Sequence, residues 1–404
     1  MPADAEATGC RAPLLAVYIA PMHALLSATA ARRFAAALWI VAVIAATAQQ
    51  GLAHQNNNYL IFRAASLHLV HGQDLYAAYP ALHFDFFKYS PTFALLFLPF
   101  ALLPFALSML LWNALNAGAL WIGIGAVLPT RRATVARAVV FLDMLGSLQN
   151  VQSNALVAGL IILTFAAYER RHTVLGSLAA GIGAAIKIFP VVGVTFALCH
   201  PRKFRVVAAV LVTTLVLLAL PLLVTPWTTL MTQYSSWQAI ENRDTVDRGF
   251  TVMQMVELLL HRDWPNLPIQ IIGAVALMAP VIVRRAQQRE WRFRLTYLCS
   301  VLVFCVIFNH QSESPTFVIA VAGAAIWFAS LPRMSRWTWA LLILFVVGTI
   351  LASSDAMPNV VQREVFDRYH AKTIPAIILW LVMQWQLWTF SPAEAISADV
   401  ASAS

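Results

Sequence analysis

Charged side chains are scarce in this sequence. Only 11% of its 404 residues are Asp, Glu, Lys or Arg, whereas an ordinary soluble domain carries about a quarter. Hydrophobic residues make up 60% of the chain, and the mean hydropathy is +0.72. This composition excludes a disordered chain, a coiled coil and a soluble cytosolic enzyme, and it favours a protein that crosses a membrane several times.

The sequence has few cysteines, and it lacks the short motifs that are typical of metal-binding and nucleotide-binding sites. The four cysteines, at positions 10, 199, 299 and 305, have neither CxxC nor metal-ligand spacing, so we interpret them as small packing residues. The sequence contains no GxxxxGK phosphate loop and no GxSxG nucleophile turn. We therefore predict no metal site and no cofactor.

Long apolar runs are abundant. A bilayer core of about 30 Å needs roughly 20 helical residues, and helices can tilt to adjust their fit. The sequence predicts an all-α, polytopic membrane protein with about twelve transmembrane helices. Ten of the runs are clear. Two are shorter: 91–103 is separated from the next run by Pro104, and 135–148 carries Asp143. In chain order the twelve runs are 34–48, 91–103, 105–128, 135–148, 155–168, 174–199, 206–224, 269–283, 295–308, 316–331, 337–351 and 374–390.

The basic residues predict the orientation. The net charge of +9 is carried mainly in short clusters between the apolar runs, which fits the positive-inside rule and anionic lipids better than nucleic acid. Arg32 and Arg33 place the N-terminus in the cytoplasm, and alternation from there leaves both termini inside. The pairs Arg131–Arg132 and Arg170–Arg171 fall on the outer side and disagree with this alternation.

These patterns predict a multi-pass protein of the cytoplasmic membrane. We expect a cytoplasmic segment at 1–33, one transmembrane domain at 34–390 and a cytoplasmic tail at 391–404. An alternative for the first segment is a translation start at Met22. Two long loops, 54–90 and 225–266, are expected outside; the first has the pattern of helices lying in the membrane interface. The second sets aromatic residues beside acids such as Glu241, which suits a carbohydrate, although aromatics also mark any membrane interface.

Four short motifs give the sequence a family resemblance. The first outer loop contains Gly72-Gln73-Asp74-Leu75-Tyr76 and ends in Tyr89-Ser90-Pro91-Thr92-Phe93. Gln152-Ser153-Asn154 and Lys187-Ile188-Phe189-Pro190 follow. In this order they resemble glycosyltransferase family 87, integral membrane enzymes of the GT-C type. The resemblance implies transfer of a sugar from a polyprenol-phosphate donor to a glycolipid or glycan acceptor of the cell envelope.

The sequence departs from the family where a catalytic Asp usually opens the first outer loop. Asn58 stands there, and an amide cannot accept a proton at neutral pH. An inverting transfer needs a general base for the acceptor hydroxyl. We therefore expect Asp85 to be the base, with Asp74 and Glu313 as the other candidates. The alternatives are an ion pair of Asp85 with Lys88, a turn at Asp74, and a structural helix start beside Glu313.

Other polar residues are candidates for substrate binding. Lys187 lies in an apolar run, where a lysine costs about 3 kcal/mol on insertion scales, so it is expected to face a polar cavity near the donor phosphate unless it snorkels to the surface. Arg63 and His310 are further candidates to contact the donor phosphate, and the alternative for each is binding of a lipid headgroup. The remaining candidates are Tyr89, Gln152 and Asn154, which belong to the motifs of the resemblance, and Asn58, which stands where the family usually has its catalytic Asp.

Two other functions remain open from the sequence. The intramembrane Lys187 and the broken spans also suit a transporter or flippase for a lipid-linked sugar or another small solute, although no inverted repeat is visible. Loss of the acid at position 58 also suits a non-catalytic protein with a retained GT-C fold.

Overall fold

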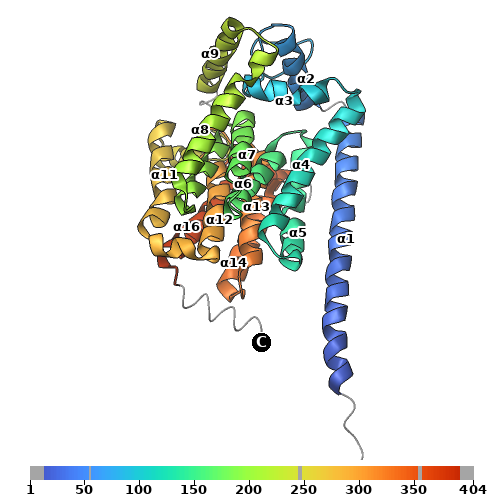
Figure 1. Cartoon of the computed structure of the whole chain (residues 1–404), viewed down its shortest axis with the longest axis vertical. Coiled ribbons are helices and arrows are strands. Elements are labelled where there is room, and N and C mark those ends of the chain that lie inside the picture. The colour runs from blue at the N-terminus through green and yellow to red at the C-terminus, as the bar shows by residue number, and fades with distance from the viewer. Residues whose placement is uncertain (1–12, 54–55, 244–247, 354–356, 392–404) are drawn as a thin grey trace, which may run out of the picture.

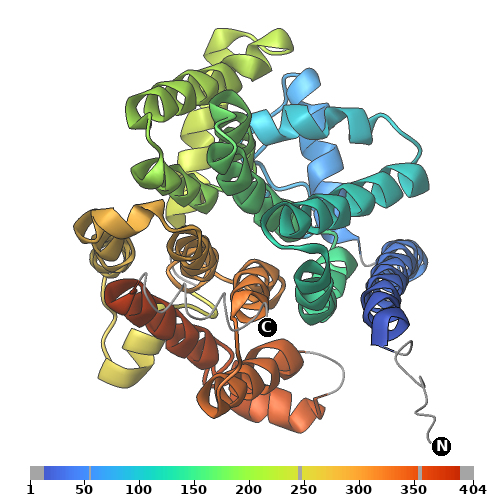
Figure 2. The same ribbon diagram turned by 60° about the horizontal axis from the view of Figure 1, so that its bottom comes forward.

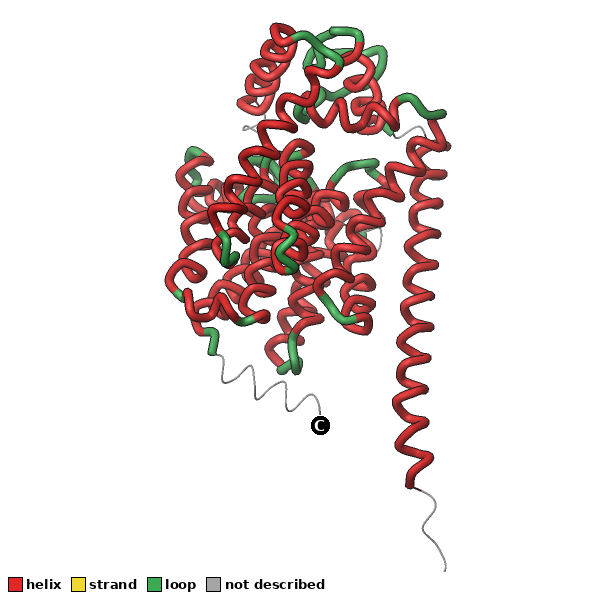
Figure 3. The backbone as a smooth tube through the Cα atoms, in the orientation of Figure 1, coloured by secondary structure: helices red, strands yellow, loops and turns green. Residues whose placement is uncertain are grey.

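The computed structural model describes residues 13–53, 56–243, 248–353 and 357–391. In these ranges the chain is helical and contains no β-strand (Figure 3), which confirms the all-α prediction. The proposed tail, apart from residue 391, the first twelve residues and the start of the first outer loop at 54–55 lie outside the described residues.

The described residues of the first half form eight α-helices and a 3₁₀ helix, which follow the predicted apolar runs and the loop between the first two of them. They are α1 (Pro13–Ala53), α2 (Asn57–Val70), α3 (Pro91–Ala101), α4 (Phe105–Val127), α5 (Thr130–Gln149), α6 (Asn154–Glu169), α7 (Thr173–Ile186), η1 (Phe189–Cys199) and α8 (Lys203–Ala219).

The second half is more interrupted. Its elements are η2 (Leu220–Leu223), α9 (Trp227–Arg243), α10 (Val252–Leu260), α11 (Asn266–Val283), η3 (Arg285–Arg289), α12 (Trp291–Ile307), η4 (Ser314–Phe317), α13 (Val318–Ser330), α14 (Arg336–Phe345), η5 (Val346–Ile350), η6 (Leu351–Ser353), α15 (Asn359–Val361), η7 (Gln362–Asp367) and α16 (Thr373–Thr389). The predicted apolar runs fall on one helix or on a helix and the turns that continue it, except the run 174–199, which is divided at Lys187 and Ile188 into α7 and η1.

Four helical stretches in the described part are long and apolar enough to cross a membrane alone. They are Ala28–Gly51 within α1, Phe105–Val127, Lys203–Leu223 and Asn266–Val283. The other apolar helices, such as α6 and α7, are shorter and pack within the bundle. The fold is therefore an all-helical bundle with apolar membrane helices, and α1 stands at its side against α4 and α5 (Figure 2).

A layer of short helices covers one end of this bundle. Helices α2, α3 and α9 lie together at the top of Figure 1, and the other helices lie below them. Phe62 of α2 is fully buried against the rings of Tyr89, Phe93 and Phe97 at centroid distances of 5.0, 5.1 and 5.5 Å. This aromatic packing fixes α2 to α3 and to Tyr89 just before it.

Ser90 joins this layer to the bundle. Its hydroxyl accepts a hydrogen bond from the Phe93 backbone N–H (3.1 Å), which caps α3, and Pro91 occupies the first turn, where no N–H is needed. The same hydroxyl donates to the Ala185 carbonyl at 2.5 Å, near the C-terminal end of α7. The Tyr-Ser-Pro motif therefore places Tyr89 beside the chain segment that contains Lys187.

A buried lysine ties three elements together below the layer. Lys372, 1% exposed, donates to the Ser314 hydroxyl at 2.8 Å and lies 4.0 Å from the Asp143 carboxylate of α5. Its ammonium also lies 4.7 Å from the centre of the Phe317 ring. These contacts hold the chain segment that carries Glu313 in place.

Breaking this pair is expected to destabilise the protein. Lys372→Met leaves Asp143 buried without its cation, which typically costs about 3–5 kcal/mol. A thermal melt in detergent should show a clear drop in Tm. The double variant Asp143→Leu with Lys372→Met removes both charges and should recover most of the loss; an unchanged Tm for Lys372→Met alone would contradict this role.

Candidate active site

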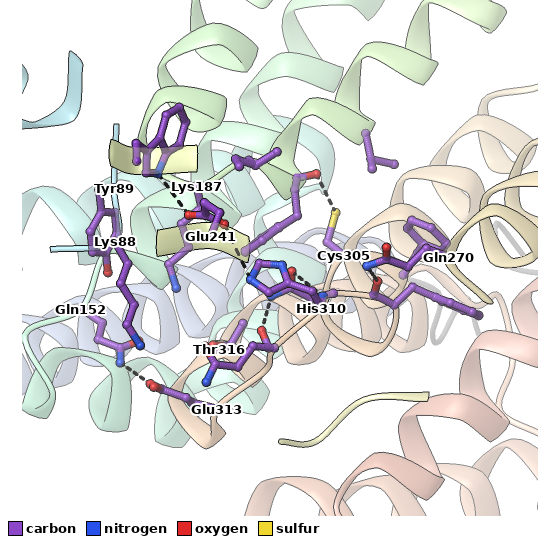
Figure 4. A pocket seen from close by; sticks show the side chains of 18 of the residues that line it. Lys88, Tyr89, Gln152, Lys187, Glu241, Gln270, Cys305, His310, Glu313 and Thr316 are labelled. Carbon is purple, nitrogen blue, oxygen red and sulfur yellow. Dashed lines mark hydrogen bonds and ion pairs between the residues drawn. The ribbon is translucent and has the colours of Figure 1, made fainter. Parts of the chain in front are cut away.

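A cavity of about 600 Å³ lies between the upper layer and the end of the bundle. Its wall comes from segments far apart in the sequence: the first outer loop, the break after α7, α9, and the turn between α12 and η4. Figure 4 shows the side chains of these segments converging on the cavity.

Seven of the ten residues singled out from the sequence line this cavity. They are Asn58, Asp85, Tyr89, Gln152, Lys187, His310 and Glu313. They span more than 250 positions of sequence, so their convergence depends on the fold rather than on local spacing. The other three residues, Asp74, Arg63 and Asn154, are not part of its wall.

Asp74 occupies the turn that its alternative interpretation predicts. One of its carboxylate oxygens accepts the Tyr76 backbone N–H at 3.0 Å, and its carbonyl accepts the Tyr79 hydroxyl at 2.6 Å. Arg63 is half-buried on α2. Neither side chain lines the cavity.

Asn154 lies directly behind the cavity wall. Its fully buried amide donates to Gln152 Oε1, and Gln152 Nε2 in turn donates to Glu313 Oε2 at 2.8 Å. The two amides of the Gln-Ser-Asn motif therefore form a relay that orients Glu313. No other donor in the described ranges contacts Glu313, so its Oε1 remains available to a substrate.

Asp85 is also on the wall, but both of its oxygens are engaged. Oδ1 accepts the Phe86 backbone N–H at 2.7 Å, and Oδ2 lies 3.8 Å from the Lys88 ammonium. Its side chain is 46% exposed. The arrangement matches the ion pair that the sequence offered as the alternative.

Glu241 is a third carboxylate on the wall, which the sequence did not single out as a site residue. Its Oε1 accepts the Trp237 indole N–H at 3.1 Å, and its Oε2 lies 3.7 Å from His310 Nε2. Trp237 and Glu241 are four residues apart on α9, so they share one helix face. That spacing, next to aromatic residues in an outer loop, is the sequence signal that could have found it.

Lys187 lies at a break in the helix. α7 ends at Ile186, and Lys187 has extended backbone angles (φ −142°, ψ 140°) before η1 begins at Phe189. No carboxylate of the described residues lies within 4.0 Å of its ammonium. Glu313 and Glu241 interact with it electrostatically across the cavity. Because its side chain lines the cavity, the Lys187 ammonium can receive an anionic group there.

Tyr89 and Asn58 complete the polar wall. Burial, together with the Glu313 charge, raises the pKa of Tyr89, so its hydroxyl stays protonated and can donate a hydrogen bond. Asn58 donates to the Asn150 carbonyl at 2.8 Å, which ties the first turn of α2 to the end of α5. Asn58 therefore lines the cavity and braces its rim.

Among the described residues, the cavity combines a carboxylate oxygen that accepts no hydrogen bond, an ammonium with no ion-pair partner, several amides and aromatic rings. Such a wall can remove a proton from a hydroxyl and stabilise a leaving anion. Among the described residues no cluster of His, Cys, Asp and Glu is suited to hold a metal ion.

Comparison with known proteins gives one family match. The model of glycosyltransferase family 87 matches residues 86–308, more than half of the chain. The matched region includes Lys88, Gln152, Lys187 and Glu241 and ends just before Glu313. No curated protein matches this chain.

Proposed function

Because the chain belongs to glycosyltransferase family 87 and is therefore a membrane glycosyltransferase, we propose that it transfers a sugar from a polyprenol-phosphate donor to a cell-envelope glycolipid or glycan. The observation that carries this proposal is the meeting, in one cavity, of the available Glu313 oxygen and the Lys187 ammonium. The transfer needs a base for the acceptor hydroxyl and a cation for the phosphate leaving group, and these two side chains can supply them.

The proposed reaction inverts the sugar at its anomeric carbon. Glu313 Oε1 takes the proton of the acceptor hydroxyl, whose oxygen forms the new bond to the anomeric carbon. The bond from that carbon to the phosphate oxygen breaks at the same time, and its electron pair leaves with the polyprenol phosphate. Lys187, assisted by His310, stabilises the negative charge on the phosphate.

Glu313 stands first among the candidate bases in this proposal because its Oε1 accepts no hydrogen bond from the part of the chain that the structure describes. Asp85 was the first choice from the sequence. With Lys88 and the Phe86 N–H on its oxygens, it suits the role of holding Lys88 at the cavity. Asp74 suits a role in shaping the loop. Asn58, Tyr89 and Gln152 are proposed to bind or orient substrate, with Asn154 acting through Gln152 and Arg63 contacting lipid.

The layer of α2, α3 and α9 is proposed to lie on the outer face of the cytoplasmic membrane. About twelve helical segments would then cross the membrane within the domain at 34–390. The predicted span 91–103 would lie in the layer as α3, and the predicted span 174–199 would cross twice, once as α7 and once as η1, which runs back from the first cavity to the other end of the bundle. The segments at 1–33 and 391–404 would lie in the cytoplasm. The basic residues at the opposite end of the bundle, such as Arg285 and Arg289, support this side for the cavity, because Lys and Arg favour the cytoplasmic side of a membrane protein.

Cysteine labelling in intact cells tests this orientation. Gln73 is exposed on the first outer loop and Ala286 is exposed at the opposite end of the bundle. With the native cysteines replaced, Gln73→Cys should react with a membrane-impermeant maleimide from outside, and Ala286→Cys should react only after the membrane is opened. The reverse pattern would place the cavity in the cytoplasm and contradict the proposed donor side.

The function itself is tested with purified protein and a set of polyprenol-phosphate sugars. We expect sugar transfer from one of these donors to extracted envelope glycolipids or glycans. Nucleotide sugars serve as the control donors and should give no transfer without the lipid carrier. Transfer from a nucleotide sugar alone would contradict the proposal.

A further inference from the structure

A second cavity, of about 440 Å³, lies at the other end of the bundle. α12 links the two cavities: its end at Phe304 and Cys305 lines the first, and its start at Arg294 and Tyr297 lines the second. α6 also joins the two ends but runs in the opposite direction, from its start beside Gln152 at the first cavity to Glu169 at the second, and its 16 residues span about 24 Å at 1.5 Å per residue. The second cavity is therefore separate from the proposed catalytic site.

This cavity is strongly basic. Five cations line it, namely Arg171, Lys203, Arg285, Arg289 and Arg294, and the acid among its lining residues is Glu169. Glu169 is already engaged, because Arg294 donates to both of its oxygens at 2.7 and 2.8 Å. In the described part of the chain the other four cations have no carboxylate partner. The cavity therefore carries about four uncompensated positive charges.

His200 supplies a second, independent feature that points to a ligand. The residue is 5% exposed and lines the cavity. Its Nδ1 accepts the Arg202 backbone N–H at 3.1 Å, so in the neutral ring Nε2 carries the proton. Burial lowers the pKa of His200, which favours this neutral form. Nε2 has no acceptor among the described residues, although buried donors are nearly always satisfied.

The surface beside the cavity is apolar. Phe204 is 90% exposed directly after Lys203, and Leu211 and Val212 of α8 are also exposed. This strip continues from the basic cavity along a helix that is long and apolar enough to cross a membrane. A ligand with a phosphate head and acyl chains would match both parts, and basic pockets between membrane helices commonly bind such heads.

We propose that this cavity binds a phosphate group, which the adjoining apolar strip identifies as the headgroup of an anionic phospholipid. The phosphate oxygens accept hydrogen bonds from His200 Nε2 and from the guanidinium groups of Arg285 and Arg289. The site gives the protein a lipid-binding function at the end of the bundle opposite the catalytic cavity, and it does not depend on the identity of the sugar.

Native mass spectrometry of the delipidated, purified full chain tests this site. The probes are phosphatidylglycerol, phosphatidylcholine and inorganic phosphate. We expect one tightly held phosphatidylglycerol. The pair Arg285→Gln and Arg289→Gln should weaken it about 30-fold, since each cation contributes about a fivefold effect. The matched control pair, Arg33→Gln and Arg131→Gln, removes two exposed arginines elsewhere and should leave the affinity unchanged.

A second variant guards against misfolding of the first. His200→Phe keeps the ring and should weaken phosphatidylglycerol about fivefold while the Tm without lipid stays close to that of the unchanged protein. Competition by inorganic phosphate would show that the phosphate group suffices, and absence of competition would show that the lipid chains are needed; both support a phosphate site. Equal binding of phosphatidylcholine, whose phosphate charge is balanced by choline, would overturn the preference for an anionic headgroup. Unchanged binding in both variants would overturn the site and leave the cations a role in orientation only.

Discussion

Replacing Glu313 by glutamine is expected to reduce sugar transfer by about 10²–10⁴-fold, the usual effect of removing a general base. The amide keeps the size of the side chain and can still pair with Gln152, but it cannot accept the acceptor's proton. The loss should fall on kcat, with donor binding retained. Initial rates over a range of donor concentrations give both quantities.

Two matched variants show whether the effect belongs to Glu313. Asp85→Asn changes another carboxylate of the same cavity and should cost less, since its oxygens are already engaged by Lys88 and the Phe86 N–H. Glu364→Gln changes an exposed carboxylate on η7 and should leave transfer unchanged. Full activity of Glu313→Gln beside an inactive Asp85→Asn would return the role of base to Asp85.

Replacing Lys187 by methionine is expected to weaken donor binding about 10- to 100-fold. The ammonium has no ion-pair partner in the described structure and faces the cavity, and a hydrogen bond to a charged group contributes about 1.5–3 kcal/mol. Methionine keeps the length of the side chain in its apolar setting. The donor Kd, measured with a non-transferable donor analogue, should rise by this factor.

The conservative change at the same position is the control. Lys187→Arg retains the positive charge and should preserve most of the donor affinity, whereas a purely structural role for the lysine stem would make both variants alike. Donor affinity in Lys187→Met equal to that of the unchanged protein would remove Lys187 from the phosphate site.

The sequence predicted the helices well because the signal is strong and local. Each apolar run is a continuous block, and Ser90 with Pro91 marks the start of α3 with its own capping chemistry. The number of membrane crossings is a weaker inference, because helices such as α6 and α7 are too short to cross alone, and periodicity does not show whether short helices are tilted or stacked.

The site was only partly predictable. The motif residues Gln152 and Lys187 could be selected by their chemistry, since polar groups in apolar runs need a reason to be there. Their partner Glu313 could be nominated, but the hydrogen bond that orients it joins positions 161 residues apart. Glu241 was named only as an acid beside aromatics in the loop 225–266 and not as a site residue, because its contact with His310 also depends on the fold rather than on sequence spacing.

The anomeric configuration of the product tests the central claim most directly. Purified protein is incubated with a polyprenol-phosphate sugar of known anomeric configuration and with its acceptor, and the product is examined by NMR while the released lipid is quantified. The mechanism at Glu313 predicts a product of the opposite configuration and one polyprenol phosphate released per sugar transferred. A product that retains the donor's configuration would contradict a single displacement driven by one carboxylate base.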